Sequence, residues 1–260
     1  MMEFNKIALS IEQGIAALRL NSPQTMNALS SELIEELGMA VNMVKNDRQV
    51  RVLYITGSEK VFAAGGDIKA MAECNPEQAR AYIEPIHQVF NNIANLPKPT
   101  IAAVSGFAFG GGVELSLSCD FRIAAENAKF GFPEINLGIF PAAGGSQRLP
   151  RLIGIQGAKR LMFTGETINA ATALSLGLVD QVVSSEQLME VVKELALKLS
   201  RKPPLAMMKL KESIQQGINT DLETAMKMEM DKCCCLFATQ DQKEGMQAFV
   251  ERREAVFKGE

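Results

Sequence analysis

Three consecutive glycines, Gly110 to Gly112, limit how this chain of 260 residues can fold. Glycine lacks a Cβ, so the backbone can adopt conformations closed to other residues, and a ligand can approach its N–H groups. A short helical pattern, Val113 to Ser118, follows directly. A helix that begins at glycines directs free N–H groups and a partial positive charge at the space before it, which favours an oxygen that gains negative charge. We expect Glu114 to lie beside this space.

A second loop of small residues, Ala63 to Asp67, follows the alternating apolar run Val50 to Thr56, which is typical of a buried strand. Two such loops can supply two N–H donors. A third segment, Phe130 to Ile135, adds Glu134, and the glycine-rich run Ala142 to Gly145 follows it. Two glutamates and two backbone donors are the components of a general acid/base pair that faces an oxyanion site. Each segment alone also fits an ordinary turn, loop or helix start.

Taken together and in this order, these segments resemble the crotonase, or enoyl-CoA hydratase/isomerase, superfamily. The resemblance extends over nearly the whole chain. So many matches in the same order make the assignment to the family specific. They say less about which reaction of the family this chain catalyses. The matching segments are Asn21 to Leu29, Phe62 to Lys69, Gly110 to Leu115, Phe130 to Gly138, Gly144 to Pro150, Phe237 to Met246, and Phe249.

The resemblance implies a role for each of the two loops and for both glutamates. The N–H groups of Gly66 and Gly111 would form an oxyanion hole for the thioester carbonyl of an acyl-CoA. Glu114 would help to activate a water for attack at the β-carbon, and Glu134 would exchange a proton at the α-carbon. Adding water to a conjugated double bond requires such a pair, because one group must take a proton and another must give one. The positions that the resemblance assigns to CoA or substrate binding are Ala63, Ala64, Asp67, Ile68, Ala142, Phe249 and Arg252.

Three positions depart from the pattern usual in this family. Ala142 stands where many hydratases have glycine, so we expect a methyl group beside the water site. Gly66 stands where alanine is common, which predicts more room over the thioester. Arg252 replaces a frequent lysine and keeps a positive charge for a CoA phosphate, and Phe249, three residues earlier, is expected on the same helical face. These changes concern substrate size more than reaction class.

The sequence thus predicts a lyase that adds water to a 2-enoyl-CoA, giving a 3-hydroxyacyl-CoA, or that runs the reverse dehydration. No cofactor is expected besides the coenzyme A that the substrate carries. A double-bond isomerase and a hydratase for a cyclic dienoyl-CoA are alternatives within the same fold. An acyl-CoA-binding or RNA-binding scaffold without turnover is a further alternative. The presence of both glutamates favours the enzyme, because a binding protein has no need for carboxylates at the reacting carbons.

Composition argues against several other classes of protein. No apolar run is long enough to span a membrane and no signal or transit segment is evident, so we expect a globular, cytoplasmic protein. A net charge of −3 without basic runs argues against a nucleic-acid partner. His87 is the single histidine and lies far in sequence from any nucleophile motif, which argues against a serine–histidine hydrolase. The five cysteines lack zinc-type spacing, so no metal is expected, and Cys233 to Cys235 are interpreted as reduced core or interface sulfur.

Short apolar segments alternate with helical patterns in the first part of the chain, which is the order of an α/β protein. One helical pattern follows a predicted cap at Ser30, and another covers Glu77 to Asn95. The segments interpreted as strands are Ile15 to Leu20, Val50 to Thr56, Thr100 to Val104 and Phe121 to Ala124.

From about Gln156 onward the strand signals mostly stop, and a helix is predicted to begin at a capping box formed by Thr220 and Glu223. The resemblance implies a crotonase-like spiral of ββα turns over residues 1–195. It implies a helical C-terminal region over residues 196–260 that packs into a homotrimer, often paired into a hexamer. Five methionines of this region fit either such an interface or a plain core: Met207, Met208, Met226, Met228 and Met230.

Overall fold

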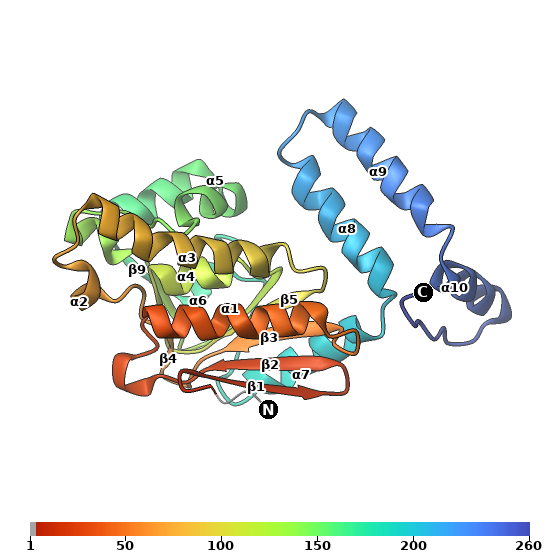
Figure 1. Cartoon of the computed structure of the whole chain (residues 1–260), viewed down its shortest axis with the longest axis horizontal. Helices are drawn as coiled ribbons and strands as arrows, with labels where there is room; N and C mark the ends of the chain where they lie inside the picture. Colours follow the sequence, from red (N-terminus) through yellow and green to blue (C-terminus); the bar gives the residue numbers. More distant parts are fainter. Residues whose placement is uncertain (1–3) are drawn as a thin grey trace.

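A six-stranded sheet is the larger of two sheets in the computed structural model, which describes residues 4–260 (Figure 1). The strand order is β1-β2-β3-β5-β7-β10. β1 and β2 pair antiparallel, and the other neighbours pair in parallel. The bounds expected for β2 and β5 are confirmed. The strands are β1 (Ile7–Glu12), β2 (Ile15–Leu20), β3 (Val52–Thr56), β5 (Thr100–Val104), β7 (Phe121–Ala125) and β10 (Gln181–Val183).

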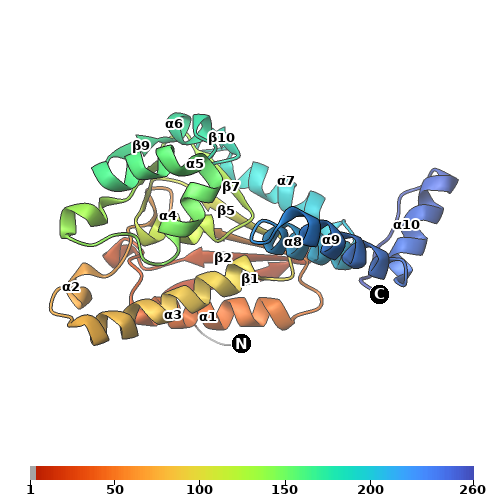
Figure 2. The ribbon, with the colours of Figure 1, turned by 90° about the horizontal axis from the view of Figure 1, so that it is seen from above.

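Helices cover both faces of this sheet, because successive residues of its central strands point to opposite sides. Leu53 and Ile55 of β3 belong to the core that α1 and α3 cover, whereas Val52 and Tyr54 pack in a second cluster against α7. Figure 2 shows α1 and α3 on one side of the strands and α7 on the other. The continuous apolar strands of the sequence are typical of such a two-sided arrangement. The bounds are α1 (Ser31–Asn46), α3 (Pro76–Ala94) and α7 (Leu188–Ser200).

A second, four-stranded sheet has the order β4-β6-β8-β9. β4, β6 and β8 pair in parallel, and β9 joins β8 antiparallel. The carboxyl ends of parallel strands meet at one edge of a sheet, so the loops that follow β4, β6 and β8 are neighbours although they lie far apart in sequence. These strands are β4 (Val61–Ala63), β6 (Phe107–Phe109), β8 (Lys129–Gly131) and β9 (Thr167–Asn169).

Side chains cap several of the helices. The Ser30 side chain accepts a hydrogen bond from the N–H of Leu33, which confirms the expected cap of α1. α3 begins at a capping box formed by Asn75 and Gln78. The short helices are η1 (Pro23–Thr25), α2 (Ile68–Met71), α4 (Gly111–Leu117), η2 (Pro133–Leu137) and α6 (Ala170–Ser175). The long helix α5 covers Gly145–Thr164.

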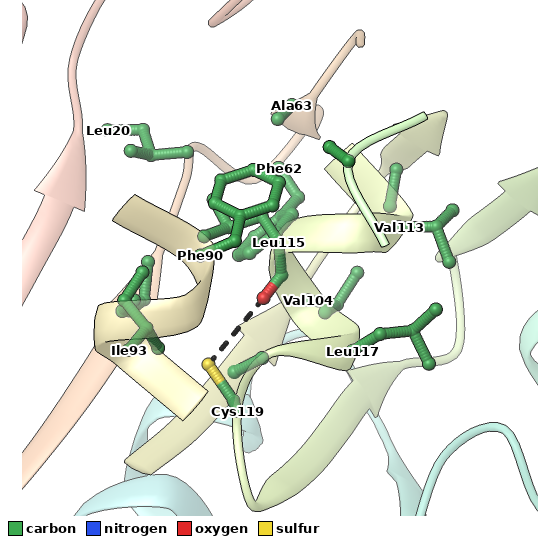
Figure 3. Close-up of a cluster of buried hydrophobic side chains, with 14 of the residues drawn as sticks. Leu20, Phe62, Ala63, Phe90, Ile93, Val104, Val113, Leu115, Leu117 and Cys119 are labelled. Atoms are coloured by element: carbon green, nitrogen blue, oxygen red, sulfur yellow. Dashed lines mark hydrogen bonds between the residues drawn. The ribbon is translucent and has the colours of Figure 1, made fainter. Parts of the chain in front are cut away.

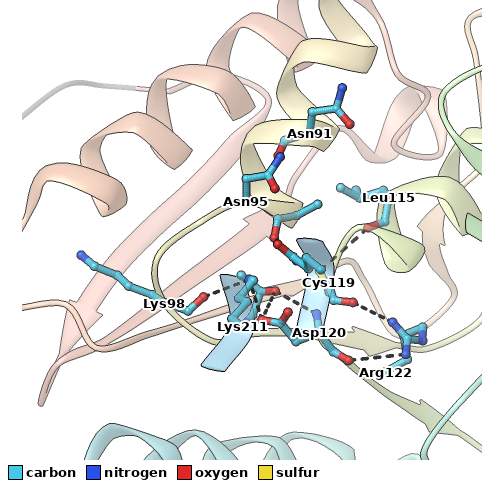
Figure 4. A network of polar contacts seen from close by, with 11 residues as sticks. Asn91, Asn95, Lys98, Leu115, Cys119, Asp120, Arg122 and Lys211 are labelled. Carbon is cyan, nitrogen blue, oxygen red and sulfur yellow. Dashed lines mark hydrogen bonds and ion pairs between the residues drawn. The ribbon is translucent and has the colours of Figure 1, made fainter. Parts of the chain in front are cut away.

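The last three helices, α8 (Pro204–Gly217), α9 (Leu222–Leu236) and α10 (Gln240–Glu251), form an arm that extends away from the two sheets (Figures 1 and 2). Lys211 of α8 attaches this C-terminal arm to the body. Its Nζ donates to Asp120 Oδ2 at 2.7 Å and to the Lys98 carbonyl at 3.2 Å (Figure 4). The division expected at residue 195 falls inside α7, and it stays a prediction.

Two expectations for the C-terminal arm are wrong in detail. α9 is capped by Asp221, whose carboxylate accepts from the N–H of Thr224, and not by Thr220 with Glu223. Asp221 directly precedes the first helical residue, so its oxygen reaches the free N–H groups of the first turn. Cys233 to Cys235 are exposed, so they are not core sulfur.

Among the methionines of the arm, Met226 and Met230 are each 60% exposed, which excludes the core interpretation for these two. An interface role for these methionines and for the cysteines stays a prediction.

Candidate active site

The glycine loops and Glu134 come together at the shared edge of β4, β6 and β8. Gly66 lies in the loop after β4, Gly111 directly after β6, and Glu134 in η2 after β8. The first two loops touch, since a Cβ placed on Gly65 would lie 3.7 Å from the N atom of Gly111. Gly65 and Gly110 have φ angles of +97° and +49°, a backbone region that favours glycine. The pairing of β4, β6 and β8 therefore brings together Gly66, Gly111 and Glu134, which lie far apart in the sequence.

The N–H groups of Gly66 and Gly111 are free in the part of the chain that the structure describes, because neither donates a hydrogen bond there. Gly111 is the first residue of α4, and the first N–H groups of a helix lie outside its hydrogen-bond ladder. Both glycines line the same cavity. Two free donors beside one cavity are the arrangement that stabilises an oxyanion.

Glu114 lies in the first turn of α4 and is only 3% exposed. Its Oε1 accepts hydrogen bonds from the N–H groups of Ala143 and Gly145, each at 2.7 Å. Burial raises the pKa of Glu114, and these two hydrogen bonds and the positive charge of Arg148 oppose that rise. Gly145 begins α5, so the carboxylate also benefits from the positive end of a helix dipole.

Glu134 is less constrained than Glu114. Its Oε2 is buried and has no hydrogen-bond partner among residues 4–260. Burial raises the pKa of Glu134 to about 7, with a smaller contribution from the negative charge of Glu114. A Cβ on Gly110 would lie within 2.0 Å of Glu134 Oε1, so the carboxyl group packs directly against the glycine turn. A carboxyl group that titrates near neutral pH can give or take a proton.

These groups share one cavity of about 630 Å³ with a mainly apolar lining. Of the residues expected to bind substrate, Ala64, Ile68 and Ala142 line this cavity, and Ala63, Asp67, Phe249 and Arg252 do not. Apolar side chains of α3, of the end of η2 and of the segment after it complete the lining. They include Ile83, Ile86, Leu137, Ile139 and Phe140.

Ala63 and Asp67 have structural positions beside the cavity. Ala63 ends β4 with its side chain fully buried in the main core (Figure 3). Asp67 caps α2, because its carboxylate accepts from the N–H of Ala70. The loop between them lines the cavity through Ala64, Gly65 and Gly66.

The expectation that Phe249 and Arg252 share a helical face is wrong. α10 ends at Glu251, and Arg252 has a left-handed φ of +56°, so its side chain leaves the helical path. Phe249 is 86% exposed on the C-terminal arm, which extends away from the two sheets (Figure 1). Arg253, and not Arg252, is held by ion pairs, to Glu244 and Glu251.

The expectation of more room beside Gly66 is also wrong. A Cβ at this position would meet Cε of Met71 at 2.9 Å, so the methionine methyl group takes up that space. Methionine is flexible enough to fill irregular gaps of this kind. Met71 lies on the four-residue helix α2, and its spacing in the sequence carries no signal of this contact.

Two further residues of the site were missed. The N–H of Ala143 donates to the carboxylate of Glu114, whereas the sequence had pointed to its neighbour Ala142 as a substrate-binding residue. The two glycines that follow Ala143 were the available signal that backbone N–H groups matter here. Tyr82 of α3 also lines the cavity, and nothing in the local sequence distinguishes it.

Within residues 4–260 no group of three or more histidine, cysteine or acidic side chains is placed to hold a metal ion. No helix of the described chain is both long and apolar enough to cross a membrane.

Comparison with known proteins identifies the family. The family model described as enoyl-CoA hydratase/isomerase matches residues 10–260, and the chain therefore belongs to this family. A crotonyl-CoA hydratase of Syntrophomonas wolfei is 47% identical over 98% of this chain and 99% of its own length. A short-chain-enoyl-CoA hydratase of Clostridium acetobutylicum is 43% identical over 97% of each. The crystal structure of an enoyl-CoA hydratase from Bacillus anthracis matches with a TM-score of 0.95 at 42% identity, over 98% of this chain and 100% of that one. The expected crotonase fold is thereby confirmed.

Proposed function

We propose that this protein is an enoyl-CoA hydratase that adds water across the 2,3 double bond of a short-chain 2-enoyl-CoA, or removes it in the reverse direction. The observation that carries the proposal is the convergence of two glutamates and two free backbone N–H groups on one cavity. The names of the similar proteins point to the same reaction.

The reaction needs the two kinds of group for different reasons. As oxygen adds to the β-carbon, charge moves onto the thioester oxygen, and the N–H groups of Gly66 and Gly111 stabilise this enolate more than they stabilise the substrate. Glu114, as a carboxylate, takes a proton from the attacking water. Glu134, in its protonated form, gives a proton to the α-carbon. The coenzyme A part belongs to the substrate, and none of these steps requires another cofactor.

The proposal is tested by incubating the purified protein with 2-enoyl-CoA esters of short, medium, aromatic and cyclic acyl groups and following the loss of absorbance of the conjugated thioester. We expect the fastest loss with crotonyl-CoA, together with formation of 3-hydroxybutyryl-CoA. Conversion of a 3-enoyl-CoA to a 2-enoyl-CoA without hydration would instead identify an isomerase.

The pKa of Glu134 predicts how this activity depends on pH. Hydration begins with Glu134 protonated and Glu114 ionised, and it ends with the proton on Glu114, so the pair carries one proton in both directions. A carboxyl group with a pKa of about 7 is protonated below that pH and ionised above it. We therefore expect kcat/KM to fall by about tenfold per pH unit above roughly pH 7.

The same decline is expected for hydration of crotonyl-CoA and for dehydration of 3-hydroxybutyryl-CoA, because the overall reaction consumes no proton and its equilibrium constant does not change with pH. Values of kcat/KM measured in both directions between about pH 6 and pH 9 check this expectation. A constant kcat/KM over the alkaline half of this range would contradict the assignment of Glu134.

We also propose that the protein assembles as a homotrimer, or as a pair of trimers, through the C-terminal arm. The arm is exposed in the single chain and carries apolar side chains such as Leu222, Phe237 and Phe249, which are 75%, 57% and 86% exposed. An exposed apolar surface of this kind is typical of an interface. Light scattering during size-exclusion chromatography is expected to give three or six times the mass of the chain. A stable monomer with full activity would contradict the proposal.

A further inference from the structure

Tyr82 joins two segments of the active site through its hydroxyl group. The side chain lies on α3, and its ring lines the cavity. The hydroxyl donates a hydrogen bond to the carbonyl of Leu29 at 2.7 Å and accepts one from the N–H of Asp67 at 2.8 Å. Asp67 follows Gly66 directly, so the hydroxyl lies one residue away from the free N–H of the proposed oxyanion hole.

Leu29 completes this arrangement from the other side of Gly66. Its N–H donates to the carbonyl of Gly65 at 2.8 Å, and Leu29 pairs with Gly66 in an isolated parallel bridge. Tyr82 holds the carbonyl of Leu29 and the N–H of Asp67 together, and Leu29 holds Gly65. The peptide groups on both sides of Gly66 are therefore connected through one hydroxyl group and one backbone segment.

At its start, the loop from Ala64 to Asp67 is also held by the N–H of Ala64, which donates to the carbonyl of Met26 at 3.1 Å. Its residues are small, and Gly65 has a φ of +97°. Among residues 4–260, Tyr82 is the one side chain outside the loop that hydrogen-bonds to the loop backbone. Oxyanion donors act through a preorganised position, so whatever fixes this loop also affects the transition state.

We propose that Tyr82 is a positioning residue that fixes the N–H of Gly66 for the thioester oxygen. The inference rests on the proposed function. A hydroxyl group has a single hydrogen, and that of Tyr82 is donated to Leu29, so it is not available to a substrate while this contact exists. Tyr82 thus acts through the backbone of Gly66 and Asp67 and not as a proton donor in the reaction.

The test is Tyr82→Phe, which removes the hydroxyl and keeps the ring that lines the cavity. We expect kcat for crotonyl-CoA to fall by about tenfold to a hundredfold, somewhat less than the loss of a whole oxyanion donor. KM, and the Kd of the unreactive butyryl-CoA, should stay within about twofold, because the lost interaction matters mainly in the transition state. Tyr54→Phe is the matched control: Tyr54, the other tyrosine of the chain, is buried against α7, away from the cavity, and its loss should leave kcat unchanged.

A spectroscopic measurement separates positioning from a general effect on folding. Hydrogen bonds to a thioester carbonyl lower its stretching frequency, so infrared difference spectra of bound acyl-CoA labelled with ¹³C at the carbonyl report on the oxyanion hole directly. We expect a smaller shift in Tyr82→Phe than in the wild-type protein and in Tyr54→Phe. Thermal unfolding of the three proteins confirms that each is folded.

An unchanged carbonyl band in Tyr82→Phe would overturn the positioning role, whether or not kcat had fallen. A wild-type protein that shifts the band but does not hydrate crotonyl-CoA would overturn the proposed function alone, since the comparison of the carbonyl bands still tests Tyr82. A wild-type protein without any shift would overturn the oxyanion hole and, with it, this role of Tyr82.

Discussion

Replacing either glutamate of the cavity with glutamine is expected to lower kcat for hydration by about a hundredfold or more, the scale of losing a positioned acid or base. Glutamine has the shape of glutamate, but it cannot take up or release a proton at neutral pH. In Glu114→Gln the amide oxygen can still accept from the N–H groups of Ala143 and Gly145, so the loop before α5 should keep its structure. In Glu134→Gln no protein hydrogen bond of Oε2 is lost, because it has none among the described residues.

Binding and kinetics together distinguish this outcome from a damaged site. The Kd of butyryl-CoA, measured by titration calorimetry, should change little in both variants, while kcat falls in the hydration and dehydration directions alike. Glu126→Gln is a suitable control, since Glu126 is exposed in the turn between β7 and β8. If either cavity variant kept more than half of the wild-type kcat on its best substrate, a mechanism with two carboxylates would be wrong for this protein.

A valine at position 111 is expected to lower kcat/KM by about a hundredfold to a thousandfold, the cost of losing one oxyanion donor. A Cβ on Gly111 would lie 2.5 Å from Cδ1 of Leu29, so the substitution forces Leu29 and the N–H of residue 111 apart. Leu29 also contacts the loop of Gly66 through the Gly65 carbonyl, and the disturbance should therefore reach both donors.

We expect Gly111→Val to change the urea midpoint of unfolding only slightly, although it lowers kcat/KM strongly. The atom that the new side chain meets is a methyl group at the end of Leu29, which can shift more easily than backbone. Gly217→Val provides the comparison: a Cβ at Gly217 in α8 makes an ordinary contact of 3.5 Å with Ala225, far from the cavity. Normal kinetics in a folded Gly111→Val protein would place the oxyanion donors elsewhere.

Much of the fold follows from local patterns in the sequence. The strands from Ile15 to Leu20 and from Thr100 to Val104 were predicted residue for residue, because they are apolar runs with clear ends. The cap at Ser30 was predicted for the same local reason. Errors occurred where one neighbouring residue decides the outcome, as when Asp221 caps α9 in place of Thr220, or where a helix ends one residue before Arg252.

The candidate site could be predicted as far as glycines and acidic residues indicate it. Tyr82 could not, since its partners lie 15 and 53 residues away and its place on α3 resembles that of any half-buried aromatic residue. Met71 was missed because the absence of a Cβ at Gly66 says nothing about which side chain takes up the space. Such contacts depend on how separate elements pack, and no local pattern encodes them.

The shared edge of β4, β6 and β8 has a consequence for how this scaffold can change during evolution. In the proposed mechanism, the groups that polarise the carbonyl are main-chain atoms whose position depends on strand pairing, and point mutations cannot remove them without altering the loops themselves. The groups that move protons are side chains of α4 and η2, Glu114 and Glu134, and a single codon change can replace either. Activation of the thioester is thus inherited as a property of the backbone, while the reaction performed on the activated molecule can diversify one side chain at a time.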